Sequence, residues 1–507
     1  MDPGYPTGSF LYLEHETKDG TGPRPSSVKL QIAIVGAGVG GLSAAIALRL
    51  DGHDVTVFES TPVLSEIGAG IQVPPNSTRI LHSWGLEAAL RQISMVPRSL
   101  LWRRWENGKI IGNSRLNPEC QDWFGSPYYV THRAHLHEIL HRKAVELGVT
   151  VRLASKVEKY NADEPSFVLA GGETVRADLV VAADGIKSLA RKTLLGTADS
   201  GLRDHGLAVF RATVSVEEML KNEKTAPLVE SPNLHLWCLT IDRVGGNNHH
   251  VMAYRFANDK LLNLVVTHPA EGEPETWDGN DHVADLRRDF EGWDPALTTL
   301  FGMVQTAVKW PLKDIQVPDR WSSASRKTVL VGDAAHAMLA FMASGAAMAV
   351  EDAVALAESL RFATRKDMVP QAVAIFEQVR IYRVKRVHEA SVKHGYTLHL
   401  SDGPEQQSRD KAMEKEVNGE HFISSPNQWS DPTVLSWLYP HKPAVAVRKA
   451  WVECGPMDGN GVNGFRNSQK RAAAVGGMCD YDLNPPSHFP CARIRSDSVE
   501  LGAGCSA

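Results

Sequence analysis

A glycine-rich turn between an apolar strand and a helix of small residues limits the fold of this chain more than any other feature of its sequence. An apolar stretch at residues 30–35 is followed by GAGVGG at 36–41 and by a helical pattern at about 42–51. A second apolar stretch at 54–59 predicts another strand. This succession of strand, tight turn, helix and strand indicates a βαβ unit, and therefore a parallel sheet.

The glycines and the acidic residue of this unit are spaced for a dinucleotide. Gly36 permits the tight turn, Gly38 lets the backbone approach a pyrophosphate at the helix amino terminus, and Gly41 allows the helix to pack closely on the strand. Glu59 ends the second strand, where a carboxylate accepts hydrogen bonds from the ribose hydroxyls and repels a 2′-phosphate. The unit therefore predicts a site for FAD or NAD rather than for NADP.

Two later strands end in residues that an NAD dehydrogenase does not need. The predicted strand 177–183 ends in Asp184 and Gly185, and the predicted strand 328–331 ends in GDAAH, which contains Asp333. Either aspartate alone is compatible with an ordinary cap at a strand-to-loop corner. Their joint occurrence favours a cofactor that later parts of the chain also contact. The sequence has no second βαβ unit with G-x-G-x-x-G for a separate NADPH site.

A β-rich pattern at about 204–269 interrupts the α/β pattern, which resumes near residue 328. We therefore predict an α/β fold in which a Rossmann-like FAD-binding domain, residues 29–195 and 312–365, carries an inserted β-sheet substrate domain, residues 196–311. A C-terminal helical region is predicted at 366–450, with Arg380, Arg383 and Arg386 on a solvated basic face. Residues 1–28 are predicted to be a polar leader and residues 451–507 a disordered tail.

Composition excludes several classes of partner and site. The 507 residues include 54 Lys and Arg against 59 Asp and Glu, a formal net charge of −5, so no basic field indicates nucleic-acid binding. The six cysteines form no C-x-x-C pair, and no metal site is predicted. The leader has no apolar core, and the longest apolar run, 334–350, is short for a bilayer. We expect a cytoplasmic protein without a membrane span.

Taken together, the motifs resemble those of the class A flavoprotein monooxygenases, in particular the salicylate hydroxylase-like branch that is common in fungi. The resemblance spans about residues 30–445. It rests on GAGVGG with Glu59, EIGAGIQVPPNSTRIL at 66–81, THRAHLHEIL with Arg133, VVAADGIKS at 180–188, and VGDAAHAMLAFMASGAAMAVEDA at 331–353. It implies the para-hydroxybenzoate hydroxylase fold.

The resemblance also implies which residues contact FAD. Glu59 matches the ribose ligand, Arg133 matches an arginine that reaches the pyrophosphate region, and Asp333 matches the aspartate that binds the ribityl chain. The other implied residues are Ala69 and Gly70 beside the cofactor, Asp184 and Gly185 in a segment that serves both FAD and the nicotinamide donor, and Gly345 and Ala346 at the start of a helix facing the flavin ring. A helix amino terminus there stabilises negative charge on reduced flavin.

The activity that the resemblance implies is NAD(P)H- and FAD-dependent hydroxylation of a phenolic or electron-rich aromatic small molecule, often in secondary metabolism. NAD(P)H binds transiently and reduces FAD, and O2 then forms a flavin C4a-hydroperoxide that attacks the substrate. Arg211 and Tyr254 fall where fungal relatives place an arginine and a tyrosine that anchor a phenolate. We expect these two residues to be catalytic.

Other functions stay open at this point. Epoxidation or dearomatisation of an indole, a polyketide or a terpenoid would use the same cofactor. A non-catalytic flavin-binding protein is an alternative because Ala337 and Ala340 replace prolines that many relatives have in this segment. A plain NAD dehydrogenase would hold no tightly bound flavin. The oligomeric state and the choice between NADH and NADPH are also open.

Overall fold

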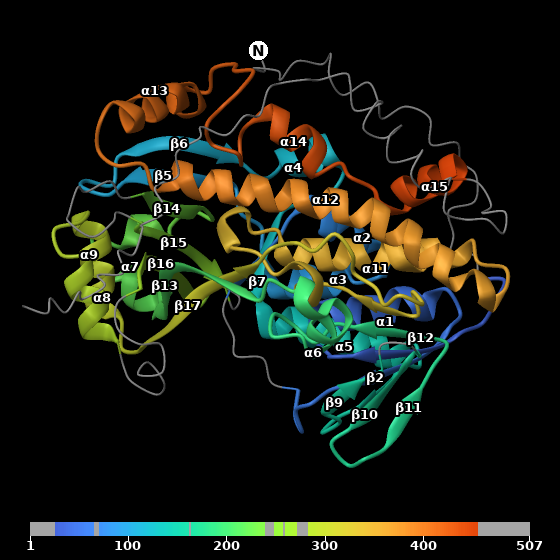
Figure 1. Cartoon of the computed structure of the whole chain (residues 1–507). Coiled ribbons are helices and arrows are strands. Elements are labelled where there is room, and N and C mark those ends of the chain that lie inside the picture. Colours follow the sequence, from blue (N-terminus) through green and yellow to red (C-terminus); the bar gives the residue numbers. More distant parts are fainter. Residues whose placement is uncertain are drawn as a thin grey trace, which may run out of the picture. The chain divides into compact units, whose positions relative to one another are not determined.

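The computed structural model describes residues 26–64, 70–161, 164–238, 248–256, 259–270 and 282–454 (Figure 1). The architecture below is that of the unit that ends at Val452. It combines a parallel sheet, a larger mixed sheet and a series of C-terminal helices. The predicted fold class is therefore confirmed.

The parallel sheet has five strands, and the glycine turn lies at its carboxyl edge. In spatial order they are β18 (Thr328–Leu330), β12 (Leu179–Ala182), β1 (Gln31–Val35), β2 (Asp54–Phe58) and β8 (Thr150–Arg152). Every pairing is parallel, and Ile34 of β1 lies opposite Val181 of β12 and Val57 of β2. Because such strands are covered on both faces, they are apolar almost throughout. The segments that follow β1, β12 and β18 consequently meet along one edge.

Helix α1 (Val39–Leu50) packs on this sheet and contacts α5 (Arg133–Glu146) and α11 (Gly345–Arg361). Small residues allow α1 and α11 to approach closely. A Cβ atom on Gly40 would lie 3.5 Å from the Cβ of Ala349 and 3.6 Å from the Cα of Gly332. The close packing brings the first turns of both helices next to the end of β18.

The larger sheet has seven strands drawn from distant parts of the sequence. Their order is β17 (Ala307–Ile315), β13 (Leu202–Ser215), β16 (Leu261–Pro269), β15 (His250–Phe256), β14 (Leu234–Cys238), β5 (Ser99–Arg104) and β6 (Ile110–Arg115). The β14–β5 pair is parallel and the other pairs are antiparallel. The sheet therefore includes two strands from the segment 29–195, and β17 crosses residue 311. The domain boundaries stay a prediction.

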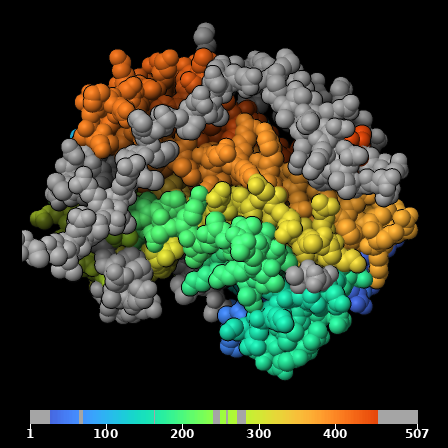
Figure 2. Space-filling view, viewed as in Figure 1, coloured from blue at the N-terminus to red at the C-terminus, as the bar shows by residue number. Residues whose placement is uncertain are grey.

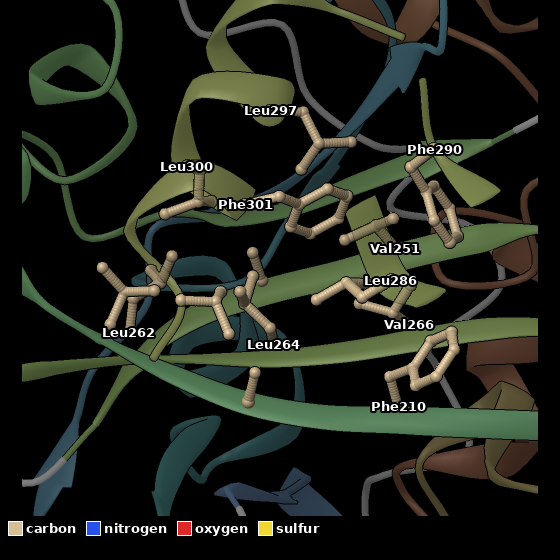
Figure 3. Close-up of a cluster of buried hydrophobic side chains, with 14 of the residues drawn as sticks. Phe210, Val251, Leu262, Leu264, Val266, Leu286, Phe290, Leu297, Leu300 and Phe301 are labelled. Carbon is tan, nitrogen blue, oxygen red and sulfur yellow. The ribbon is translucent and has the colours of Figure 1, made fainter. Parts of the chain in front are cut away.

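One face of the seven-stranded sheet is covered by α8 (Val283–Asp289) and α9 (Pro295–Met303). Figure 3 shows side chains from these helices, such as Phe301, directed at the strands. The core on this face includes Phe210, Val251, Leu262, Leu264, Val266, Leu286, Phe290, Leu297, Leu300 and Phe301, each at most 2% exposed. Alternate residues of each strand point away from this core, so the opposite face is free to form a site.

Two small sheets and several short helices connect these parts. One sheet has the order β3 (Gly70–Val73), β7 (Tyr129–His132) and β4 (Ser94–Met95), and the other β11 (Thr174–Arg176), β10 (Ser166–Leu169) and β9 (Val157–Tyr160). The short helices are α2 (Pro75–Ser83), α3 (Glu87–Ile93), α4 (Glu119–Phe124), α6 (Leu189–Leu195), α7 (Val216–Leu220) and α10 (Asp333–His336). The surface around α6, green in Figure 2, lies beside the yellow segment that precedes β18. Arg320 of that segment donates a hydrogen bond to the carbonyl of Leu194 in α6 at 2.8 Å.

The C-terminal helices begin with α12 (Val369–Leu398), which packs along α11 (Figure 1). The expectation of a solvated basic face on this helix is wrong for two of its three arginines. Arg380 and Arg383 are 0% and 5% exposed. They form ion pairs with Glu351 and Asp352 of α11 at 2.6–3.0 Å. Buried acidic partners on a neighbouring helix therefore hold arginines that the sequence pattern places in water.

Three further helices end the described chain: α13 (Pro404–Asn418), α14 (Pro432–Leu438) and α15 (Pro443–Cys454). Because α15 extends to Cys454, the first residues of the predicted tail are helical. The rest of that tail and residues 1–25 of the predicted leader lie outside the described residues. Within the described helices, none combines the length and apolar character that a membrane crossing requires.

Candidate active site

The glycine turn between β1 and α1 forms a cradle that one of its glycines leaves open. Gly36 has a φ of +99°, and a Cβ atom there would lie 2.3 Å from the carbonyl oxygen of Ala183. A Cβ atom on Gly41 would lie 1.9 Å from the carbonyl oxygen of Gly36. Gly38, in contrast, has no atom within 4 Å of such a Cβ position. Two glycines thus serve packing, and the third borders free space at a helix amino terminus, which fits a pyrophosphate.

Glu59 faces this turn from the end of β2. Its Oε2 accepts a hydrogen bond from the backbone N–H of Ala37 at 2.8 Å, and its Oε1 accepts one from that of Thr61 at 2.9 Å. Burial raises the pKa of the Glu59 carboxyl, but these bonds and one from the Ser60 hydroxyl lower it by more, so the pKa lies below its ordinary value. The carboxylate is ionised at neutral pH and keeps acceptor capacity for ribose hydroxyls.

The two aspartates at the later strand ends differ in their surroundings. The Asp184 carboxylate accepts hydrogen bonds from the Ser188 hydroxyl and from the Ala190 N–H at 3.0 Å, so it caps the start of α6. Gly185 follows with a φ of +77°. Asp333 is exposed and has no hydrogen bond or ion pair with another side chain in the described part of the chain. Asp333 is therefore free to accept a ligand hydroxyl, whereas Asp184 holds its own loop.

The first turn of α11 begins at Gly345 and Ala346, beside the turn that carries Asp333. A buried arginine, Arg191 of α6, connects this region to the loop after β12. Its guanidinium donates to the carbonyl of Ala334 at 3.2 Å and to that of Ile186 at 2.9 Å. The predicted cofactor segments that follow β1, β12 and β18 are thus brought together at one edge of the parallel sheet.

Three residues that the sequence predicts for the site, Gly70, Arg133 and Tyr254, lie where the small sheet that contains β3 meets the larger sheet. The fourth, Ala69, lies outside the described residues. A Cβ atom on Gly70 would lie 2.2 Å from Cε2 of Tyr254, so only glycine leaves room for that ring. The Gly70 N–H also donates to the side-chain oxygen of Asn263 at 3.3 Å. Arg133 is exposed at the first position of α5.

Arg211 and Tyr254 lie on the face of the seven-stranded sheet that points away from its core. The buried Nε and Nη1 atoms of Arg211 have no hydrogen-bond partner in the described ranges, and its guanidinium lies 5.8 Å from the ring centre of Trp310. The pKa of Arg211 lies below its ordinary value, mainly because of burial. Interaction with Tyr254 opposes this decrease, and the charge of Arg133 adds to it. Burial raises the pKa of Tyr254 to about 12, and Arg211 opposes that rise. A guanidinium with unused donors thus lies near a neutral phenol.

A buried histidine, His250, meets a half-buried one, His399, at this same face, and neither was predicted from the sequence. The His250 Nδ1 atom lies 2.8 Å from Nε2 of His399, and its Nε2 atom lies 3.2 Å from the hydroxyl of Thr267. Burial, together with His249, lowers the pKa of His250 to about 3, so the ring is neutral. One signal was available: His250 precedes Tyr254 by four residues in an alternating strand, which places both side chains on one face. His399, the C-cap residue of α12, had no such signal.

Known proteins are similar to this chain in sequence and in fold. Residues 29–391 match the family described as the FAD binding domain. The FAD-dependent monooxygenase OpS4 of Beauveria bassiana (strain ARSEF 2860) is 32% identical over 420 residues, 82% of this chain and 96% of that protein. The 3-amino-4-hydroxybenzoate 2-monooxygenase PtmB3 of Streptomyces platensis is 34% identical over 391 residues, 76% of this chain and 93% of that protein.

Among solved structures, CtdE in complex with FAD and substrate 4 superposes with a TM-score of 0.70 at 22% identity, covering 88% of this chain and 100% of that chain. This likeness supports the fold. Because the family match spans the glycine turn, both later strand ends and the sheet that carries Arg211, the chain belongs to the FAD-binding domain family and is an FAD-dependent oxidoreductase related to monooxygenases.

Proposed function

We propose that this protein is an NAD(P)H- and FAD-dependent monooxygenase that hydroxylates a phenolic or electron-rich aromatic small molecule. The observation that carries the proposal is Arg211, whose buried Nε and Nη1 atoms lack hydrogen-bond partners among the described residues. Buried N–H groups of a cation that lack partners are destabilising until an acceptor binds to them. Arg211 therefore fits a phenolate or carboxylate oxygen of the substrate. The Streptomyces platensis relative is named for a substrate that carries both groups.

The reaction inserts one atom of O2 into an aromatic C–H bond and releases the other atom as water. NAD(P)H and a proton supply the two electrons and the hydrogens for that water. FAD, when bound, supplies the activation of O2. The side chains of this protein bind and orient the substrate: Arg211 holds its oxyanion, and Tyr254, neutral because of its raised pKa, donates a hydrogen bond to it. Removal of charge from the phenol oxygen would make the ring less nucleophilic, so a cation that stabilises the phenolate favours attack.

The cofactor residues are proposed on the same basis. Glu59 would bind the adenosine ribose, Gly36, Gly38 and Gly41 would form the pyrophosphate turn, and Asp333 would bind the ribityl chain. The remaining proposed contacts are made by Ala69, Gly70, Arg133, Asp184, Gly185, Gly345 and Ala346. NAD(P)H is proposed to bind transiently, because the sequence has no second βαβ unit with G-x-G-x-x-G. A place in secondary metabolism is supported by the resemblance alone.

Steady-state kinetics of one variant and a matched control test the proposal. Arg103 is also an arginine of the seven-stranded sheet, but it donates to His235 at 3.1 Å and to the Gly108 carbonyl at 2.8 Å, so its partners are supplied by the protein. We expect Arg211→Met to keep bound FAD and to raise KM for a phenolic substrate at least about tenfold, as loss of a charge-assisted hydrogen bond would. Arg103→Met should lower stability and leave KM unchanged.

The readouts are NAD(P)H oxidation, O2 uptake and product mass over a panel of phenols and hydroxybenzoates. A hydroxylated product whose formation depends on Arg211 supports the proposal. An epoxide or a dearomatised product would favour that alternative activity. Bound FAD with no substrate-dependent NAD(P)H oxidation on any compound would favour a non-catalytic flavin protein. An unchanged KM in Arg211→Met would remove Arg211 from the substrate site.

A further inference from the structure

A single buried carboxylate holds both ends of the turn that carries Asp333. This turn is helix α10, and Gly332 precedes it. Asp352 of α11 is 0% exposed, and its Oδ2 accepts hydrogen bonds from the Gly332 N–H at 2.9 Å and from Nε2 of His336 at 2.6 Å. Its Oδ1 accepts one from Nε of Arg380 at 2.7 Å. Asp333 lies between the two anchored residues, and its own carboxylate is left exposed.

We propose that Asp352 is a positioning residue for FAD: it holds the Gly332 backbone N–H and the His336 side chain, on either side of Asp333, and thereby aims the Asp333 carboxylate at the flavin side chain. Asp352 does this from within α11, the helix whose first turn, at Gly345 and Ala346, borders the same region. The inference rests on the proposed role of Asp333. It adds a residue that contacts no cofactor and acts through Gly332 and His336.

Both side-chain oxygens of Asp352 accept hydrogen bonds, so a replacement side chain must place an acceptor at each of these two positions. Asparagine at this position would keep one oxygen and replace the other by an NH2 group. In one orientation the NH2 group would face the Gly332 N–H, and in the other it would face Nε of Arg380, so either orientation sets a donor against a donor. Gly332 has a φ of +58° and a ψ of −144°, a backbone conformation that glycine adopts more readily than other residues. Its N–H is buried. Without its acceptor, the turn would lose the bond that holds it there.

A matched control is present at the opposite end of the α1–α11 pair. Asp51 is also buried, at 1% exposed, and its carboxylate accepts a hydrogen bond from Nε of Arg361 at 2.8 Å. Asp51 caps the end of α1, and Arg361 is the last residue of α11. Asp51→Asn therefore weakens the same pair of helices without touching the turn around Asp333.

The experiment measures FAD binding and stability separately. Apoproteins of the wild type, Asp352→Asn and Asp51→Asn are titrated with FAD, with flavin fluorescence and the visible absorption spectrum as readouts. Each apoprotein is also unfolded in urea without FAD. We expect Asp352→Asn to raise the Kd for FAD at least about tenfold and to alter the spectrum of the bound flavin. Asp51→Asn should lower the urea midpoint and leave the Kd within about twofold.

Two further variants keep the inference open to refutation if Asp352→Asn does not fold. His336→Gln retains an N–H donor toward Asp352 and should bind FAD nearly as the wild type does, whereas His336→Leu removes that donor and should bind it more weakly. Equal Kd values for these two variants, or an Asp352→Asn protein with wild-type Kd and spectrum, would overturn the inference. Asp333→Ala separates the two proposals: wild-type FAD affinity in this variant would refute the role of Asp333 itself.

Discussion

Replacing each of two glycines in the turn after β1 by alanine should impair different properties: the stability of the fold in one case and the affinity for FAD in the other. Gly41→Ala is expected to destabilise the apoprotein, because the added methyl group meets backbone atoms. Gly38→Ala is expected to leave the fold intact and to weaken FAD binding, because the added methyl group enters open space at the start of α1. The pair therefore separates the packing role of the motif from its binding role.

The magnitudes follow from the contacts. A Cβ on Gly41 would lie 1.9 Å from the Gly36 carbonyl oxygen, so α1 must move from β1 by about 1 Å to restore an allowed distance. Overpacking of this kind costs about 1–3 kcal/mol, and the better helix propensity of alanine offsets up to about 1 kcal/mol. The obstacle is backbone, so we expect a net loss near 2 kcal/mol. Gly38 has φ −69° and ψ −177°, which alanine adopts freely, so its replacement should cost less than about 1 kcal/mol.

Urea unfolding of the two apoproteins gives the free energies, and FAD titration gives the Kd values. The expected pattern is a lowered free energy of unfolding for Gly41→Ala and a Kd raised at least about tenfold for Gly38→Ala. If Gly38→Ala bound FAD as tightly as the wild type, the open space at this turn would not be the pyrophosphate cradle. If Gly41→Ala lost no stability, the packing argument for Gly41 would be wrong.

Three further predictions concern stability. Phe301→Ala empties part of the core under the seven-stranded sheet, where the ring is 2% exposed, and should lower the free energy of unfolding by about 3–5 kcal/mol in urea titrations; a loss below about 1 kcal/mol would contradict the assigned burial. Ala343 has a φ of +49°, in the left-handed region, so Ala343→Gly should raise the thermal midpoint by the equivalent of up to about 1 kcal/mol, and a lowered midpoint would refute this. The lowered pKa of Glu59 means that its ionised form stabilises the fold above the ordinary carboxyl pKa, and that this contribution is lost as the pH falls through the folded-state pKa. Acid unfolding monitored by tryptophan fluorescence should consequently be steeper below about pH 4.5 in the wild type than in Glu59→Gln, and parallel curves would rule out this contribution.

Local patterns were sufficient to predict that the glycine turn and the later strand ends meet at one edge of the parallel sheet. The glycines at 36, 38 and 41 and the acid at 59 act within one βαβ unit, so their spacing carries the information directly. The strand ends at Asp184 and Asp333 could also be placed at that edge, because parallel strands present their carboxyl ends together. Their different roles could not be predicted: the Ser188 hydroxyl and the Ala190 N–H engage the Asp184 carboxylate, while Asp333 stays exposed.

The parallel sheet, the glycine turn and the membership of a flavoprotein family follow from local sequence motifs. Which distant groups meet depends on the packing of the folded chain. It joined β5 and β6 to the seven-stranded sheet, and it buried Arg380 against Glu351 and Asp352. It also set His250 beside His399, 149 positions later in the chain. A turn or a strand is encoded by neighbouring residues, whereas the partner of a buried polar side chain is selected by the packing of elements that are far apart in sequence.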